Sequence, residues 1–251
     1  FKPILYGLIT AVLLILSLCL YEYYQEGIPY RFTGYFNNPN QLGYYSICSF
    51  SLIYLFYRNS YINFSFMIFI MIIIILFSIL TLSKASYVSL IVCAFFAINP
   101  SNYRYSKIIE LIIILLIIFL FLLFFQDISE MNMFKRTLYM FKESDSSLSQ
   151  RGYTVFFEGN SLQTIFGMGV KNVYKFNRYE IHSTLGMIFT SFGLIGFLVF
   201  LSLMIFWILD IKESYGLRGV ICVCGPSLLY GLTHNGVRFT MFWRMFAVTI
   251  S

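Results

Sequence analysis

The sequence predicts an all-α membrane protein in which several helices cross a bilayer and pack as a bundle. Of its 251 residues, 59% are hydrophobic and 11% are charged, and the mean hydropathy is +0.78. A soluble globular domain carries about a quarter charged residues. Several apolar runs also approach the ~20 residues that a helix needs to cross a bilayer. We therefore expect a polytopic transmembrane helical bundle that forms a single membrane domain over residues 1–251.

Seven stretches are apolar enough to be predicted as spans. In chain order they are residues 3–21, 42–57, 64–82, 85–98, 108–125, 184–209 and 219–232, and residues 236–251 begin a candidate eighth. The two short stretches at 85–98 and 219–232 require flanking residues or neighbouring helices to shelter their ends. Because the chain opens without a Met and is apolar at both ends, we expect it to be a fragment of a longer protein.

Alternation of these spans places the connections on two sides of the membrane. One side receives six basic residues in short connections or at the chain start, namely Lys2, Arg58, Arg104, Lys107, Lys212 and Arg218. The short connections of the other side receive only two Lys or Arg residues, Arg31 and Lys84, together with the His234-Asn235 pair. Because Lys and Arg in short loops mark the cytoplasmic side, the second side should face the periplasm or cell exterior. The long loop, at about residues 126–182, should lie there and contain short helices.

The cysteines and the charge distribution indicate neither a metal site nor nucleic-acid binding. All five cysteines fall inside predicted spans, where a free cysteine behaves as a small hydrophobic residue: Cys19, Cys48, Cys93, Cys222 and Cys224. The spacing of Cys222 and Cys224 does not match a zinc knuckle. The net charge of +6 is spread over both faces, so it does not predict a nucleic-acid partner.

Polar groups beside the membrane are candidate functional groups, because such groups are costly at membrane depth. Four places qualify, and all fall on the predicted outer side. The first is the loop at 31–43, which contains Arg31, Asn37 and Asn40. In one interpretation Asn40 caps the helix that follows. In the other, the asparagines present amides to a sugar or a phosphate.

The second place is Lys84, between two apolar runs, which is either a lysine snorkelling to the interface or an anion ligand. The third is an amphipathic helix predicted to begin near Arg151, which leads into Gly167-Met168-Gly169 and whose apolar side is formed by Val155, Phe156, Leu162 and Phe166. These glycines permit close backbone approach to a phosphate. Arg151 is either a solvated helix residue or a phosphate ligand.

The fourth place is His182, directly before the predicted span at 184–209. It is either a structural hydrogen-bonding residue or a proton-transfer group. Cations, amides and one imidazole on one side of the membrane suit an anionic, polar ligand such as a lipid-linked diphosphate sugar.

The same residues resemble the O-antigen polymerase and O-antigen ligase superfamily of bacterial surface-polysaccharide enzymes. The matching pieces cover about residues 31–196: GYFNNPNQLG at 34–43, SKAS at 83–86, Arg151 leading to Gly167-Met168-Gly169, and His182 followed by SFGLIG at 191–196. The resemblance implies a multi-pass glycosyltransferase of the bacterial inner (plasma) membrane whose site faces outward. Its donor and acceptor would be glycans carried on undecaprenyl diphosphate, and other polysaccharide-export membrane proteins are candidate partners.

The resemblance also implies roles for individual residues. Lys84 and Arg151 would hold the diphosphate, with Arg151 part of the catalytic group, and His182 would activate the acceptor hydroxyl. Five further residues would contribute to substrate binding: Arg31, Asn37, Asn40, Gly167 and Gly169. The scheme uses no metal and no other cofactor.

Two departures from the family pattern bear on the type of enzyme. Lys84 stands where arginine is usual, which keeps the charge but loses the bidentate fork, and Ser183 follows His182 where asparagine is common. Both fit a divergent polymerase of O-antigen or capsule, which we favour over a ligase. A lipid-linked sugar transporter or flippase is the alternative from another class. It predicts inverted repeats and helices broken at mid-membrane, of which the sequence shows only Gly225-Pro226.

Overall fold

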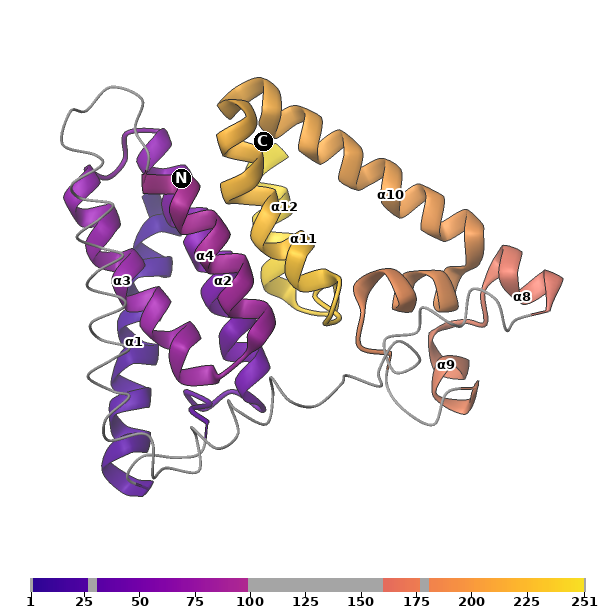
Figure 1. The fold of residues 1–251 in the computed structure, drawn as a ribbon, viewed down its shortest axis with the longest axis horizontal. Helices are drawn as coiled ribbons and strands as arrows, with labels where there is room; N and C mark the ends of the chain where they lie inside the picture. Colours follow the sequence, from indigo (N-terminus) through magenta and orange to yellow (C-terminus); the bar gives the residue numbers. More distant parts are fainter. Residues whose placement is uncertain (1, 27–30, 99–159, 177–180, 251) are drawn as a thin grey trace. The chain divides into compact units, whose positions relative to one another are not determined.

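The computed structural model describes residues 2–26, 31–98, 160–176 and 181–250. Within these ranges the regular structure is helical, and no strand occurs there. The chain forms two compact units, Phe1–Ser144 and Asp145–Ser251, where the sequence predicts a single membrane domain. Each unit is described by itself (Figure 1).

The first unit is built around one central helix. Its described helices are α1 (Lys2–Glu26), α2 (Pro39–Arg58), α3 (Phe64–Thr81) and α4 (Lys84–Ile98). Helix α2 packs against all three of the others and is buried along most of its length. The predicted helices at 3–21, 42–57, 64–82 and 85–98 are thereby confirmed as helices. The predicted span at 108–125 lies outside the described residues.

Asparagine caps fix where two of these helices begin. Asn38 Oδ1 accepts from the Gln41 N–H at 3.0 Å, and Asn63 Oδ1 accepts from the Phe66 N–H at 2.8 Å. The expectation that Asn40 caps α2 is therefore wrong. Proline is favoured in the first turn of a helix, so Pro39 begins α2 and the residue before it becomes the cap.

Three helical stretches are long and apolar enough to cross a membrane: Lys2–Gln25, Phe64–Thr81 and Thr184–Gly231. Ala85–Ala94 is a shorter apolar helix. Helix α2 is not among the three, since Asn40, Gln41 and several serines lower its hydropathy, although neighbouring helices bury the serines. The described chain thus contains three candidate spans where the sequence predicts more.

The second unit is organised by one long helix that is bent twice. Its elements are α8 (Ser161–Phe166), α9 (Val170–Phe176), α10 (Thr184–Gly219), the π-helix η1 (Val220–Cys224), α11 (Gly225–Gly231) and α12 (Thr240–Ile250). Helix α10 packs against α8, α9, η1 and α12. The π-helical turn precedes Pro226, which has no N–H to offer the carbonyl of Cys222.

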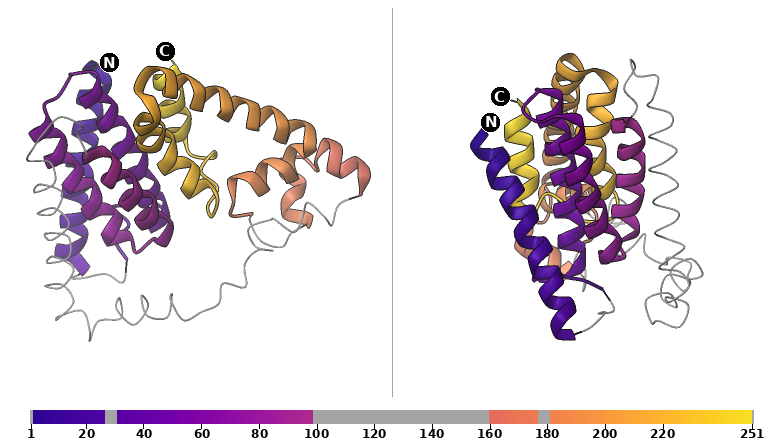
Figure 2. Two further views of the ribbon diagram at one scale, coloured as in Figure 1. Left: turned by 45° about the horizontal axis from the view of Figure 1, so that its top comes forward. Right: turned by 90° about the vertical axis from the view of Figure 1, so that its left-hand side faces the viewer.

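Two glycines bend α10, and the first of them divides the predicted span at 184–209. Gly193 has φ 66° and ψ −166°, and Gly216 has φ 70° and ψ −173°, a conformation essentially restricted to glycine. The predicted continuous helix therefore changes direction at Gly193 (Figure 2). About 22 residues lie between the two bends, which corresponds to roughly 33 Å of helix and is enough to cross the hydrocarbon core.

The cores of both units are apolar, as the composition predicts. All five cysteines are buried, which confirms their interpretation as small buried residues. In the second unit Trp207 is fully buried, and its indole N–H donates to Thr249 Oγ1 at 2.7 Å. Its ring lies 6.1 Å from that of Phe242 and 5.5 Å from that of Phe246. Trp207 thus joins α10 to α12.

We predict that Trp207→Ala lowers the free energy of unfolding by about 3–5 kcal/mol, the usual loss for a buried aromatic side chain. Phe206→Ala is the matched control, because Phe206 is the neighbouring aromatic residue of α10 and is 68% exposed. Thermal unfolding of the purified protein in detergent measures both. Equal stability losses for the two variants would contradict the central role of Trp207.

Candidate functional site

The loop between α1 and α2 is held by a buried carboxylate. Glu22 is only 7% exposed. Its carboxylate oxygens accept from the N–H of Thr33 at 3.1 Å and of Gly34 at 2.9 Å, and from the Thr33 hydroxyl at 3.3 Å. Hydrogen bonds to a charged group stabilise more than neutral ones, so Glu22 fixes the loop on α1. Glu22 was not among the site residues predicted from the sequence, although an acid directly after a long apolar run is a signal.

Arg31 attaches the same loop to two other helices. Its Nε donates to the carbonyl oxygen of Thr81 at 2.7 Å, and its Nη2 donates to Asn40 Oδ1 at 2.9 Å. Thr81 is the last residue of α3, where a cation also interacts favourably with the helix dipole. Arg31 and Asn40 were predicted to bind a substrate. Two guanidinium nitrogens of Arg31 and the amide oxygen of Asn40 instead form hydrogen bonds within the protein.

Asn37 and Lys84 lie close to this junction in the chain. Asn37 is exposed, and its backbone N–H donates to Gln41 Oε1 at 3.2 Å. Lys84 is the first residue of α4 and follows Thr81 by three positions. The structure thus brings four predicted site residues to one end of the first unit. We call this the loop corner, formed by Arg31, Asn37, Asn40 and Lys84.

Buried hydroxyl groups lie at the start of α4, beside the loop corner. Ser83 and Ser86 are buried, and within the described part of the unit neither hydroxyl has a hydrogen-bond partner. Gly43 of α2 lies against Ser86, where a Cβ atom would overlap the hydroxyl. A buried polar group without a partner costs free energy. The two hydroxyls therefore leave unsatisfied polar groups buried beside the loop corner.

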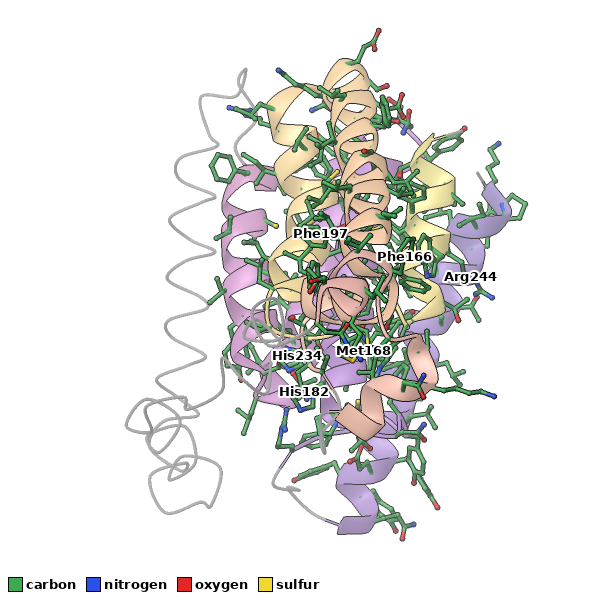
Figure 3. All side chains as sticks on the ribbon, turned by 90° about the vertical axis from the view of Figure 1, so that its right-hand side faces the viewer. Phe166, Met168, His182, Phe197, His234 and Arg244 are labelled. Carbon is green, nitrogen blue, oxygen red and sulfur yellow. The ribbon has the colours of Figure 1, made fainter. Side chains whose placement is uncertain are left out.

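His182 is presented by a rigid turn in the second unit. Its neighbours in the chain, Ile181 and Ser183, are fully buried, whereas His182 itself is exposed. Ser183 is the N-cap of α10, and its hydroxyl accepts from the Gly186 N–H at 3.0 Å. The backbone on both sides of the imidazole is therefore fixed by packing while the ring remains accessible (Figure 3).

Thr184 connects this turn to the loop between α11 and α12. Its hydroxyl donates to the carbonyl oxygen of His234 at 3.1 Å and accepts from the Gly236 N–H at 2.9 Å. Both histidines of the chain therefore lie at the same end of the second unit, as Figure 3 also shows. We call this the histidine corner, formed by His182, Ser183, Thr184, His234 and Gly236.

His234 is held on two sides within this corner. Its ring stacks on Tyr230, with ring centroids 4.6 Å apart, and its Nδ1 lies 2.9 Å from the Thr233 hydroxyl. His234 was not among the site residues predicted from the sequence. The only signal for it was the predicted topology, which places it on the same side as His182.

The Gly167-Met168-Gly169 segment packs against the bend in α10 through backbone hydrogen bonds. The Gly167 N–H donates to the carbonyl of Gln163 at 2.8 Å, the Met168 N–H to Thr190 at 2.8 Å, and the Gly169 N–H to Ser191 at 3.0 Å. Carbonyl groups at the end of a helix segment need such donors. The amides that we expected to be phosphate ligands therefore bond to the main chain, so a phosphate at this loop would need other donors.

The predicted site residues do not all belong to one unit. The loop corner belongs to the first unit, and Gly167, Gly169 and His182 belong to the second. Arg151 lies outside the described residues. Across the ranges that the structure describes, no group of three or more His, Cys, Asp or Glu residues could hold a metal ion.

Comparisons of the chain with models of protein families, with characterised proteins and with solved structures find no match.

We predict that Gly167→Ala destabilises the second unit by more than Gly216→Ala does. Both glycines have a backbone conformation that costs a non-glycine residue about 1–3 kcal/mol. A Cβ at Gly167 would also overlap backbone atoms of Ser191 and Gly193, whereas nothing lies within 4 Å of one at Gly216. Thermal unfolding of the two variants gives the difference. Equal losses would show that α8 does not need this close contact with α10.

Proposed function

We propose that this protein is a membrane glycosyltransferase that polymerises undecaprenyl-diphosphate-linked repeat units of a bacterial surface polysaccharide, either O-antigen or capsule. The observation that carries the proposal is the position of His182. An exposed imidazole on a rigid turn, joined through a glycine bend to an apolar helix of membrane length, is well placed to act on a lipid-linked substrate. The ordered motifs that resemble the O-antigen polymerase and ligase superfamily support the same function.

The reaction needs a base and a set of positive charges. The acceptor hydroxyl loses its proton and attacks the anomeric carbon of the donor glycan, whose bond to the diphosphate breaks as undecaprenyl diphosphate leaves. Histidine exchanges protons near neutral pH, so we assign His182 as the general base. Lys84 and Arg151 are assigned to the phosphates, where they offset the negative charge that develops on the leaving group.

The loop corner supports the assignment of an anion site. It places Arg31 and the start of α4, which carries Lys84, beside buried hydroxyls of Ser83 and Ser86. Because Arg31 bonds to Thr81 and Asn40, we assign it to positioning the loop. Asn37, whose side chain is exposed, is the residue of this corner that we assign to sugar hydroxyls.

The proposed setting is the bacterial inner membrane, with a multi-pass chain and both corners on the outward side. The basic short connections support this orientation. Donor and acceptor would reach the site as lipid-linked glycans from the surrounding bilayer. Other membrane proteins of polysaccharide export are proposed as further partners.

Deletion of the gene is expected to leave single repeat units on the surface glycan and to remove the long chains, because a polymerase joins repeats to one another. Gel electrophoresis of the glycan tests this expectation. Loss of all attachment to the core lipid would instead identify a ligase. Intracellular accumulation of the lipid-linked repeat, with no repeat units exported, would identify a transporter or flippase.

We predict that His182→Gln lowers turnover by roughly 10²–10⁴-fold, the usual contribution of a positioned acid or base, while donor-lipid binding is largely kept. Glutamine can hydrogen-bond to a sugar but cannot accept its proton. The assay uses purified protein with a lipid-linked repeat as substrate. His234→Gln is the matched variant, and it should affect stability more than turnover because that ring is held by Tyr230 and Thr233.

Polymerisation by His182→Gln at the wild-type rate would show that the imidazole only orients the sugar. In that case the general-base assignment is wrong, even if the protein is a polymerase.

A further inference from the structure

The apolar side chains of helix α8 are exposed, whereas two of its polar side chains are partly buried. Leu162, Ile165 and Phe166 are 71%, 40% and 64% exposed, respectively. They are spaced i, i+3 and i+4, so they share one face of the helix. Gln163 and Thr164 are the less exposed residues of the same helix. A helix that faces water shows the opposite arrangement.

The polar groups of α8 bond within its own first turn. Asn160 Oδ1 accepts from the Gln163 N–H at 2.9 Å, and the Gln163 side chain accepts from the Asn160 N–H at 3.4 Å. The Thr164 hydroxyl donates to the carbonyl of Asn160 at 3.0 Å. Many of the hydrogen-bonding groups at the start of the helix are therefore satisfied within the protein and not by water, as a segment in contact with lipid requires.

The apolar face of α8 is held firmly in place. The Met168 and Gly169 N–H groups, directly after the helix, donate to Thr190 and Ser191 of α10. Figures 1 and 2 show α8 beside the bend of α10. The exposure of Leu162 and Phe166 thus belongs to a packed helix and not to a loose loop.

The exposed surface continues onto the apolar part of α10. Directly at and beyond the bend, a series of large apolar side chains is exposed: Phe192, Leu194, Ile195, Leu198 and Val199. These residues lie within the candidate membrane span Thr184–Gly231, for which lipid is the expected surrounding. Since Ser191 contacts the segment after α8, the two apolar surfaces adjoin.

We propose that α8 is a membrane-interface helix whose Leu162, Ile165 and Phe166 insert among lipid acyl chains. Acyl chains fit this face better than a protein partner does. The face adjoins the exposed side chains of the candidate span Thr184–Gly231, for which lipid is the expected surrounding. Lys171, exposed at the start of α9, is suited to lipid headgroups just beyond the helix.

This inference does not depend on the proposed enzymatic function. It assigns part of the predicted outer loop to the membrane interface, whereas the sequence predicts only that the loop faces the periplasm or cell exterior. The long loop would then be anchored at the membrane surface near the histidine corner, because α8 and His182 are attached to the same segment of α10.

The test uses the full chain in vesicles of phosphatidylcholine and phosphatidylglycerol, with a cysteine introduced at one position and labelled with the fluorophore NBD. Leu162→Cys and Phe166→Cys report the apolar face. Ser161→Cys is the matched control, because Ser161 is exposed on the same helix but is polar. The wild-type chain, labelled in parallel, corrects for reaction at its five buried cysteines.

For positions 162 and 166 we expect the emission to shift to shorter wavelength on reconstitution and to be quenched by lipids with nitroxide-labelled acyl chains. Position 161 should be quenched more by aqueous iodide. Water-like emission with iodide quenching at both 162 and 166 would overturn the proposal. A short-wavelength emission that nitroxide lipids fail to quench would also overturn it, since it would show that a second copy or another protein covers this face.

Discussion

The satisfaction of polar groups inside an apolar chain is the constraint on which the rest of this structure depends. A backbone or side-chain polar group in lipid must find its partner within the protein. The ends of the helices meet this requirement through contacts distant in sequence. Glu22 binds the loop that follows α1, Arg31 joins the end of α3 to the start of α2, and Thr184 joins the start of α10 to the loop after α11. Each contact fixes a corner from which an exposed side chain can act.

The glycine bend in α10 follows from the same constraint. A helix that changes direction leaves carbonyl groups without donors, and here the segment after α8 supplies two of those donors. Gly167 and Gly193 permit the approach because neither has a Cβ atom and their backbones meet closely. The bend therefore determines where α8 lies, and it separates the membrane-length part of α10 from the short first segment, residues 184–192, that follows the His182 turn. One local backbone feature thus supports both the candidate base and the proposed interface helix.

The two corners differ in how many of their polar side chains already form contacts within the protein. In the loop corner Arg31 and Asn40 bond to one another and to the main chain, so they mainly build the loop. In the histidine corner His234 is stacked and hydrogen-bonded, whereas His182 remains exposed between two fully buried neighbours. An exposed titratable group on an otherwise fixed turn is expected for a residue that acts on a ligand and not on the fold.

The sequence by itself determined the helices, because an apolar run is a local property. The predicted helix at 64–82 corresponds to α3 within one residue, and the burial of the five cysteines also follows from their surroundings in the chain. Tertiary structure decided the roles of the polar residues. Arg31 meets Thr81, and Thr184 meets His234, each across 50 positions, and no local pattern predicts such pairs. The glycines after α8 look like phosphate ligands in the sequence, but the Gly167 amide bonds to Gln163 of α8 and the Gly169 amide bonds to Ser191 of α10. The second bond is possible because the positive φ at Gly193 ends a helix that hydropathy predicts to continue.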